Sequence, residues 1–580
     1  MRVAISLSLL LALSGCVTVR DRAPRTPVEV QILAINDFHG ALEPPRSSVR
    51  ASRSDGTEVQ VPAGGAAHLA TAIAELRQGH PNTITVAAGD LISASPFASS
   101  QFLDEPAVLA LNAMELELSA VGNHEFDRGP EELKRLQEGG CTRHTARAPC
   151  RVDPDFPGAQ YRYLAANVRT AGGDTLFPAT SIRSFGTGAT AVRVGFIGLT
   201  LKETPTLVVP SAVAGLTFAD EAETINALAP RLRAEGADAV VVLIHQGVAT
   251  EVEYNDKSCG GVSGALLPIL AKLDPAVDVV VSGHTHNAYV CDYAGTDPAR
   301  PLLVTSAGRS GMTVSDITLT IDPASRRVLA KSADNVIVQG VGYTGSSGAV
   351  AVDPAFPAFT ADPQVAAVVE RYVAAAEPIA RRVVGRVTAP ASRDRSAAGE
   401  SPLGSLIADA QLSASGAEIA FMNSFGVRAD LVPAADGSVT YGQLYAVQPF
   451  GNVLQVKGLT GAQLRAVLEQ QWDSGLNTVE RPNMLQVSRG FAFSYDLRRP
   501  AGQRIVSMTL DGRPIEDARV YRVAVSNFLA TGGDGFTELI AGADLGGQIE
   551  DLDALEAYIA QGPVAPPATG RITRIDLPPG

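Results

Sequence analysis

The chain has 580 residues, of which 46% are hydrophobic and 19% charged, and its formal net charge is −14. This length is too great for one compact core, so two domains are expected, and the composition is that of a folded chain rather than a disordered one. The negative charge argues against nucleic-acid polymers as partners, because their phosphate backbones bind basic surfaces. A small phosphate ester remains compatible, because bound metal ions can supply local positive charge.

The N-terminus has the pattern of an export signal. Arg2 precedes an apolar run that ends in LSGC, which resembles a bacterial lipobox with Cys16 as the lipidated residue. We therefore expect residues 1–16 to be a lipoprotein signal peptide and residues 17–27 a polar tether; a plain secretory signal is the alternative. Val17 favours the outer membrane, since an aspartate there often marks inner-membrane retention. Nothing later in the sequence predicts a transmembrane helix, so the lipid is the expected membrane contact.

The remaining cysteines are even in number. They are Cys141, Cys150, Cys259 and Cys291. In an exported chain this predicts two disulfides, for which three pairings are possible. Local loop closure favours Cys141–Cys150 and Cys259–Cys291. A thiolate metal site is the alternative, disfavoured because no CxxC motif occurs.

Secondary-structure patterning divides the chain into two units. Apolar runs alternate with amphipathic stretches over residues 28–340, which is typical of an α/β (α+β) domain. A Gly/Ser/Ala-rich stretch reads as a connection. Asp362-Pro363 then predicts a helix start, and we expect a linking helix over residues 362–384 that Pro378 kinks or ends. A second, smaller α/β unit is expected over residues 385–576.

Metal-competent side chains directly follow five predicted strands. In open α/β sheets such strand ends converge on one site, so these segments are expected to meet. Oxygen and imidazole ligands without thiolate favour Mn, Zn, Fe or Co over Ca. Each segment alone would more often be structural, but the ordered set is specific. The residues are Asp37, His39, Asp90, Asn123, His124, Asp127, His245, His284 and His286.

The order DxH, GD, GNHE, H and GHxH resembles the calcineurin-like metallophosphoesterase superfamily. GNHEFD followed by a second domain resembles the 5′-nucleotidase family, and the resemblance covers about residues 28–575. It implies a β-sandwich flanked by helices, a linking helix and a smaller substrate-binding domain. It also implies two divalent metal ions, with His124 and Asp127 as a catalytic pair; a helix N-cap is the alternative role for Asp127. The implied ligands are Asp37, His39, Asp90 and His286 for one ion, and Asp90, Asn123, His245 and His284 for the other.

Substrate recognition is expected in the second unit. Arginines bind phosphate bidentately, aromatic rings stack on bases, and a carboxylate accepts hydrogen bonds from ribose hydroxyls. The resemblance implies a base between two phenylalanines, which could instead be core residues. Two departures stand out: NSFGVR replaces the usual NGGGIR, so that Phe425 is expected to narrow the pocket, and PLG replaces NLG. The implied residues are Arg393 (with Arg395 second), Asn423, Arg428, Phe450, Asn452, Phe528 and Asp534.

The function that this resemblance implies is hydrolysis of nucleoside 5′-monophosphates to nucleoside and phosphate, for extracytoplasmic nucleotide scavenging. Pyrophosphatase activity on UDP-sugars or NAD, or 2′,3′-cyclic nucleotide phosphodiesterase activity, would use the same metal site. A nucleotide-binding surface protein is the alternative outside enzymes. Because metals and base recognition would lie on different units, domain closure across residues 362–384 is expected.

Overall fold

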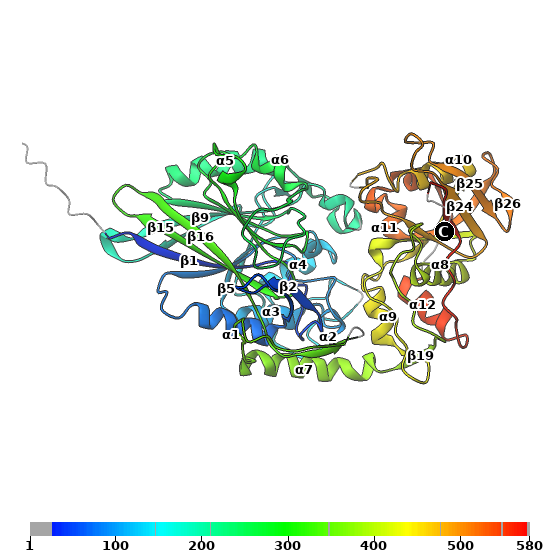
Figure 1. Ribbon diagram of the computed structural model, residues 1–580, viewed down its shortest axis with the longest axis horizontal. Coiled ribbons are helices and arrows are strands. Elements are labelled where there is room, and N and C mark those ends of the chain that lie inside the picture. Colours follow the sequence, from blue (N-terminus) through cyan, green and yellow to red (C-terminus); the bar gives the residue numbers. More distant parts are fainter. Residues whose placement is uncertain are drawn as a thin grey trace, which may run out of the picture.

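The computed structural model describes residues 26–145, 147–208, 210–345, 348–475, 477–546 and 549–576. The expected signal peptide, Cys16 and the tether up to residue 25 lie outside the described residues. Two halves lie side by side, and a long helix runs along one side of the first half toward the second (Figure 1). The mixed α/β fold in two domains agrees with the prediction.

The described first half is built on two six-stranded sheets. Their orders are β16-β15-β1-β4-β5-β6 and β13-β14-β12-β11-β9-β8. Side chains that alternate along the strands, such as Ile32 and Val86 on one sheet and Val194 and Val241 on the other, fill the space between the sheets. The bounds are β1 (Val28–Ile35), β4 (Thr83–Ala87), β5 (Leu116–Ala120), β6 (Arg162–Leu164), β15 (Thr313–Asp322) and β16 (Arg327–Ile337), and β8 (Thr180–Phe185), β9 (Val192–Thr200), β11 (Ala239–His245), β12 (Val279–Ser282), β13 (Ala288–Asp292) and β14 (Leu303–Ala307).

Helices cover the outer faces of this sandwich. On the first sheet lie α1 (Ala66–Leu76), α3 (Glu105–Ala113) and α4 (Pro130–Glu138), and on the second α5 (Glu221–Ala234) and α6 (Leu266–Leu270). The central strands β1, β4, β11 and β12 are therefore buried on both faces, which explains their nearly continuous apolar sequences. A short helix, α2 (Phe97–Ser100), and a hairpin of β2 (Ser48–Ser52) and β3 (Glu58–Pro62) lie at the edge of the sandwich.

The connection between the halves differs from the prediction in two places. The Gly/Ser-rich stretch contains two short strands, β17 (Tyr343–Gly345) and β18 (Gly348–Val350), which pair antiparallel. The linking helix, α7 (Pro363–Ala380), ends four residues earlier than expected, and β19 (Val383–Arg386) already includes residues 383 and 384. Pro378 lacks an N–H and ends the helix within one turn, with Arg381 as the last capping donor.

Helix α7 is anchored on the first half. Its N-cap Asp362 accepts hydrogen bonds from the backbone N–H groups of Gln364 and Val365, both at 2.9 Å. Tyr372 is fully buried, donates to Asp153 at 2.8 Å and packs edge-on against Phe102. The helix therefore extends the first body.

The described second half contains a five-stranded sheet, β23-β20-β27-β22-β28, and a four-stranded sheet, β26-β25-β24-β29. Two hydrophobic clusters fill it, one around Phe421 and Phe491 and one around Leu406 and Leu444. The bounds are β20 (Ile419–Asn423), β22 (Leu454–Thr460), β23 (Leu485–Val487), β24 (Phe491–Tyr495), β25 (Ile505–Leu510), β26 (Arg513–Pro514), β27 (Val520–Ser526), β28 (Ala543–Asp544), β29 (Ile572–Arg574), α8 (Pro402–Ser415), α9 (Tyr441–Val447), α10 (Gly461–Glu469), α11 (Asn527–Ala530) and α12 (Asp551–Ile559).

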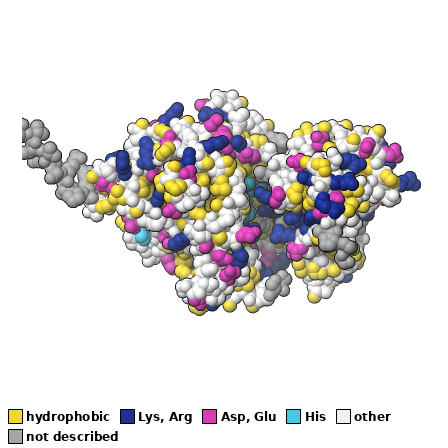
Figure 2. Space-filling view, turned by 45° about the horizontal axis from the view of Figure 1, so that its top comes forward, with side chains coloured by type: hydrophobic (Ala, Val, Ile, Leu, Met, Phe, Trp, Pro, Cys, Tyr) yellow, Lys and Arg dark blue, Asp and Glu magenta, His cyan; other side chains and the backbone are white. Residues whose placement is uncertain are grey.

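Two disulfides, Cys141–Cys150 and Cys259–Cys291, are present in the described chain, in the local pairing that the sequence favours. No helix among the described residues is both long and apolar enough to cross a membrane. The halves touch where Phe97 of α2 packs edge-on against Tyr441 and Tyr445 of α9, with ring centroids 5.9 and 5.2 Å apart. The surface is hollowed between the halves, and Lys and Arg side chains gather along the hollow on the second half (Figure 2).

Candidate active site

The carboxyl ends of the parallel strands of both sheets meet at one edge of the sandwich. Asp37 follows β1, Asp90 follows β4 and Asn123 follows β5, while β11 ends at His245 and His284 follows β12. Strands β1, β4 and β5 run parallel in one sheet and β11 and β12 in the other, so the residues after them leave each sheet at the same end. Five segments distant in sequence therefore come together as the pattern predicts.

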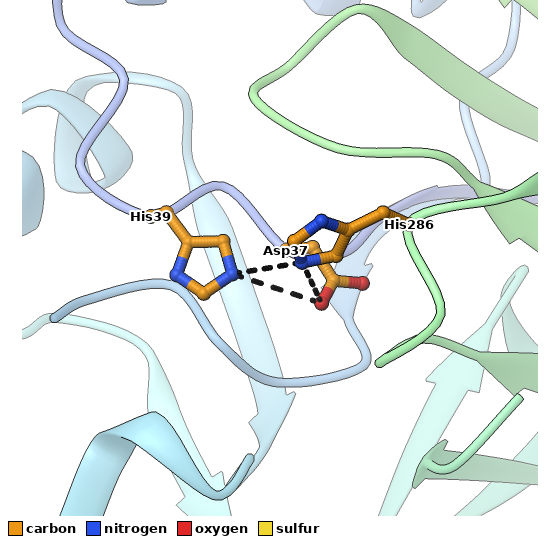
Figure 3. Close-up of side chains that lie close together, drawn as sticks. All are labelled: Asp37, His39 and His286. Atoms are coloured by element: carbon orange, nitrogen blue, oxygen red, sulfur yellow. Dashed lines mark hydrogen bonds and ion pairs between the residues drawn. The ribbon is translucent and has the colours of Figure 1, made fainter. Parts of the chain in front are cut away.

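The first cluster consists of Asp37, His39 and His286, with one ligand atom of each within 4.8 Å of the others. Figure 3 shows the carboxylate and the two rings pointing toward one another. His286 Nε2 lies 3.4 Å from Asp37 Oδ1 and 3.2 Å from His39 Nε2. Burial raises the pKa of Asp37 to about 7, so this carboxylate is costly to ionise without a positive charge beside it. A cation at this point would offset that cost.

The second cluster consists of Asp90, His245 and His284. Asp90 Oδ2 lies 2.9 Å from His245 Nε2 and 3.7 Å from His39 Nε2, so one carboxylate oxygen faces both clusters. Asn123 stands beside this cluster, with its Oδ1 3.1 Å from His284 Nδ1. The placement is that of a bridging carboxylate between two neighbouring ion sites.

The donor atoms fit divalent metal ions. His39 and His245 each place Nδ1 against a backbone carbonyl, of Ser93 at 2.9 Å and of Ala88 at 2.8 Å. These carbonyls hold the proton on Nδ1 and leave the Nε2 lone pair free, which is the usual arrangement of metal-binding histidines. His245 Nε2 is buried and lies 2.9 Å from Asp90 Oδ2. An ion shared by the two atoms would bind both.

His124 and Asp127 form a pair outside these clusters. His124 Nδ1 lies 2.8 Å from Asp127 Oδ2, and its backbone N–H donates to Asp90 Oδ1 at 2.9 Å. Burial alone would lower the pKa of His124, but the carboxylates of Asp127 and Asp90 outweigh burial and raise this pKa to about 9. The alternative role of Asp127 as a helix cap is wrong, because Gly129 is the N-cap of α4.

Glu125 lies at this edge, and no role for it was predicted from the sequence. Its buried carboxylate accepts hydrogen bonds from the backbone N–H groups of Asp90 at 2.9 Å, Leu91 at 2.8 Å and Gly122 at 2.6 Å. It therefore joins the loop after β4 to the loop after β5. The available signal in the sequence was the position of this acidic residue inside the GNHEFD motif, directly after His124.

Asn36 was missed in the same way. Its Nδ2 donates to Asp37 Oδ2 and to the carbonyl of Gly308, both at 2.7 Å, and its Oδ1 accepts from Ala307 N–H at 2.7 Å. This side chain orients the Asp37 carboxylate and ties β1 to the loop after β14.

The second half brings an arginine and an aromatic ring to this edge. The Phe450 ring lies parallel to the His124 ring, with centroids 6.1 Å apart, and the Arg428 guanidinium lies 5.7 Å from the Phe450 centroid. Arg428 is exposed to solvent, and partial desolvation together with nearby Arg309 and Arg393 lowers its pKa. Three guanidinium groups near one point predict an anion there.

Arg393 and Arg395 take different directions. Arg393 donates to the carbonyl of Arg428 at 3.0 Å, whereas Arg395 donates to the carbonyl of Pro482 at 3.3 Å. Both line a cavity of about 670 Å³ together with Arg428 and Phe425. Phe425 is 39% exposed and has Arg481 over its ring at 5.8 Å, so it forms a wall of this cavity.

Asn423 and Asp534 meet across the second half. Asn423 donates to Asp534 Oδ2 at 2.7 Å, and Asn483, which the sequence analysis missed, donates to the same oxygen at 3.0 Å. The Phe528 ring packs on Gly533, where a Cβ atom would come within 2.5 Å of it. The glycine-rich segment is therefore shaped around this ring. Both Phe450 and Phe528 are half-buried, so neither is a closed core residue.

The other histidines lie away from this edge and have structural surroundings. His68 is buried with Nδ1 2.8 Å from the carbonyl of Phe359, and His80 pairs with Glu29 at the surface at 3.3 Å. His144 lies exposed in the loop that Cys141 and Cys150 close.

Comparisons with known proteins agree with this geometry. Residues 30–288 match a family model for calcineurin-like phosphoesterases, and residues 383–540 match one for the 5′-nucleotidase C-terminal domain. A cell wall protein of Listeria monocytogenes is 33% identical over 89% of the chain, and the chain spans 65% of that protein's length. The 5′-nucleotidase of Bos taurus is 26% identical over 94% of the chain and 91% of its own length. The crystal structure of a 5′-nucleotidase precursor from Thermus thermophilus superposes with a TM-score of 0.69 at 26% identity, covering 95% of this chain and all of that one.

Proposed function

Because the chain belongs to the family in which a calcineurin-like phosphoesterase domain precedes a 5′-nucleotidase C-terminal domain, we propose that it hydrolyses nucleoside 5′-monophosphates to nucleoside and phosphate. The observation that carries this proposal is the meeting of the two halves at His124. Phe450 and Arg428 of the second half lie against the edge where the two clusters of metal ligands converge. An aromatic ring and a guanidinium beside a metal centre are the groups that a base and a phosphate need.

The metal ligands are assigned from the two clusters. Asp37, His39 and His286 would hold one ion, and Asn123, His245 and His284 would hold the other, with Asp90 available to both. When bound, two divalent ions supply a nucleophilic water at neutral pH and neutralise charge on the phosphoryl oxygens. The nitrogen and oxygen donors suit Mn, Zn, Fe or Co.

His124 is the general acid in this proposal. Asp127 occupies its Nδ1 side, so its Nε2–H is left for the substrate. The oxygen of water bonds to phosphorus and the water releases one proton to solvent, while the bond from phosphorus to the 5′ oxygen breaks. The 5′ oxygen takes a proton from His124, or takes it from solvent if His124 instead donates a hydrogen bond to the phosphoryl group. The raised pKa of His124 keeps the ring protonated before the reaction.

The nucleotide is bound by the second half. Arg428 and Arg393 bind the phosphate, and the exposed faces of Phe450 and Phe528 stack on the base. Asp534 accepts from a ribose hydroxyl, because its Oδ2 is fixed by two asparagines and Oδ1 receives no hydrogen bond among the described residues. Asn452 lies in the turn that carries Phe450 and contacts the base.

The cavity lined by Arg393 and Arg428 favours a second candidate substrate class. Its volume of about 670 Å³ and its lining by Arg393, Arg395 and Phe425 leave room for a further group on the phosphate. UDP-sugars and dinucleotides such as NAD carry such a group.

Both candidates are tested by measuring phosphate release from AMP, UDP-glucose, NAD and a cyclic nucleotide. The measurement is made after EDTA treatment and again after Mn or Zn is added back. For the two compounds joined by a pyrophosphate, release of the mononucleotide is measured as well. Metal-dependent release from AMP supports the main proposal, and faster cleavage of UDP-glucose or NAD supports the second. No metal-dependent release from any compound would contradict both and favour a nucleotide-binding surface protein.

The enzyme is proposed to act outside the cytoplasm, anchored by lipid at Cys16. Support comes from the export pattern of the N-terminus, from the two disulfides and from similarity to a cell wall protein. Cys16→Ser is expected to move the protein from the membrane fraction to the soluble exported fraction. Retention of the variant in the outer-membrane fraction would contradict the lipid anchor.

A further inference from the structure

The turn that carries Phe450 is joined to the helix that carries Phe528. Strands β22 and β27 are antiparallel, with Leu454 opposite Ser526, so the residues before β22 and after β27 lie at the same end of the sheet. Asn527 joins them: its Oδ1 accepts from Val453 N–H at 3.1 Å and from Phe528 N–H at 3.0 Å. Asn452 precedes Val453 and is therefore held where both aromatic residues leave the sheet.

Asp551, the first residue of α12, forms two hydrogen bonds with Asn452. Its backbone N–H donates to the carbonyl of Asn452 at 2.8 Å, and its Oδ2 accepts from Asn452 Nδ2 at 3.3 Å. Asp551 is only 2% exposed, and its Oδ1 is buried without a hydrogen-bond partner in the described chain. Burial raises the pKa of this carboxyl to about 7. A carboxylate kept in such a place costs stability, which is expected where it serves a function.

An ionised carboxylate can only accept hydrogen bonds, so it fixes the orientation of the Asn452 amide. Nδ2 must face Asp551, and Oδ1 must face the opposite way. Among the described residues no donor reaches that Oδ1, and Asn452 itself is partly exposed. The side chain therefore presents a fixed hydrogen-bond acceptor beside the two phenylalanines.

We propose that Asp551, acting through Asn452, makes this site prefer bases with an exocyclic amino group over bases with a carbonyl at the same position. The preferred bases are adenine and cytosine, and the disfavoured ones are hypoxanthine and uracil. The inference rests on the proposed function, since it requires the base to lie at Phe450 and Phe528. An amino group donates to the fixed oxygen, whereas a carbonyl faces it with like partial charge. Asp551 is thus a positioning residue for base selection.

Binding of free nucleosides to the EDTA-treated protein tests this inference without hydrolysis. Calorimetry at pH 8.5, where Asp551 is ionised, is expected to show adenosine binding about tenfold more tightly than inosine, the factor typical of one hydrogen bond. Asp551→Asn can donate to Asn452 and lets its amide turn, so the ratio should fall to one or below. Asp553→Asn is the matched control, because Asp553 is exposed in the same turn of α12. It removes the same charge and should keep the wild-type ratio.

A second variant tests the inference independently in case Asp551→Asn does not fold. Asn452→Ala removes the acceptor at a partly exposed position and should also equalise adenosine and inosine. The ratios of kcat/KM for AMP over IMP and for CMP over UMP should follow the binding ratios in every variant, while Asp553→Asn keeps the kcat of wild type within about twofold.

The outcomes separate the two proposals. Equal binding of adenosine and inosine by the wild type, an unchanged ratio in Asp551→Asn, or binding of neither nucleoside would overturn the inference. Selective adenosine binding without phosphate release from AMP would overturn the proposed function and leave the inference intact. Phosphate release from AMP and IMP with equal kcat/KM would support the proposed function and overturn the inference.

Discussion

At the scale of single residues, the proposed ligands have unusual backbone conformations. Asp37, His39, Asp90, His284 and His286 all have positive φ, between 46° and 72°. For residues other than glycine this conformation is uncommon and costs about 1–3 kcal/mol each, so the surroundings must hold it in place. Backbone hydrogen bonds do so: Asp37 N–H donates to Gly89 and His39 N–H to Asp90, both at 3.0 Å. These hydrogen bonds hold the backbone of the proposed ligands in this conformation.

The first prediction concerns His124. His124→Ala is expected to lower kcat by a factor of about 10²–10⁴, because it removes the acid and its charge from the reacting centre. The variant should still bind both metals, since the proposed ligand set does not include His124. Turnover by phosphate release and metal content by mass spectrometry check the two statements. His80→Ala, a surface histidine paired with Glu29, is the control. Wild-type turnover in His124→Ala would refute the assignment.

The second prediction concerns the stability cost of Asp551. Its pKa is near 3.8 when unfolded and about 7 when folded, so the folded state holds the proton more strongly and loses stability as pH rises between these values. Asp551→Asn removes this loss. The free energy of unfolding of the variant relative to wild type should therefore increase between pH 4 and pH 8, by up to about 4 kcal/mol. Urea unfolding at the two pH values measures the change; a difference independent of pH would show that Asp551 titrates normally.

At the scale of elements, the sequence predicted most of what positions the site. Long apolar runs identified β1, β4, β11 and β12, and the polar residues directly after them proved to converge. Asp362-Pro363 correctly marked the start of α7. These signals are local, because strand burial and helix capping act within a few residues.

Other features could not be predicted because they depend on partners far away in sequence. Glu125 is adjacent to a proposed catalytic residue, but its role depends on the loop after β4 coming close to it. Asn483 acts on Asp534, 51 residues away, and Asp551 acts on Asn452, 99 residues away. The hairpin of β17 and β18 was read as a connection because glycine and serine are equally common in loops and tight turns.

The third prediction concerns the two loops that Glu125 joins. Glu125→Gln replaces an acceptor by an amide that donates toward a backbone N–H, so the loops carrying Asp90 and Asn123 should separate slightly. Metal affinity is expected to fall about 10–100-fold, as for other residues that orient metal ligands. Competition with a chromophoric chelator measures this affinity. Glu131→Gln is the control, since Glu131 lies on the exposed side of α4 and pairs with Lys134. Equal affinities in the two variants would show that Glu125 does not position the ligands.

At the scale of the whole molecule, catalysis and recognition are divided between the halves. The first half carries the proposed metal ligands, and the second carries Arg428, Phe450 and Phe528. Because Tyr372 anchors α7 on the first half, movement of the second half must occur after Ala380, in the segment before β19. The contact of Phe97 with Tyr441 and Tyr445 lies across this boundary and must slide or open during such movement. We expect substrate entry and product release between the halves to require this movement of the second half.

The fourth prediction tests this movement. A Phe97→Cys/Tyr441→Cys double variant joined by a short bismaleimide should lose at least about tenfold in kcat, because the fixed boundary hinders nucleoside release. The two rings lie 5.9 Å apart, so a short linker spans the positions without distorting the fold. Linkage is verified by peptide mass spectrometry, and each single cysteine variant treated with the same reagent controls for modification. Equal turnover of AMP by the linked enzyme and the unlinked double variant would show that the halves do not need to move. The hollow between the halves would then have to admit nucleotides in the arrangement seen here.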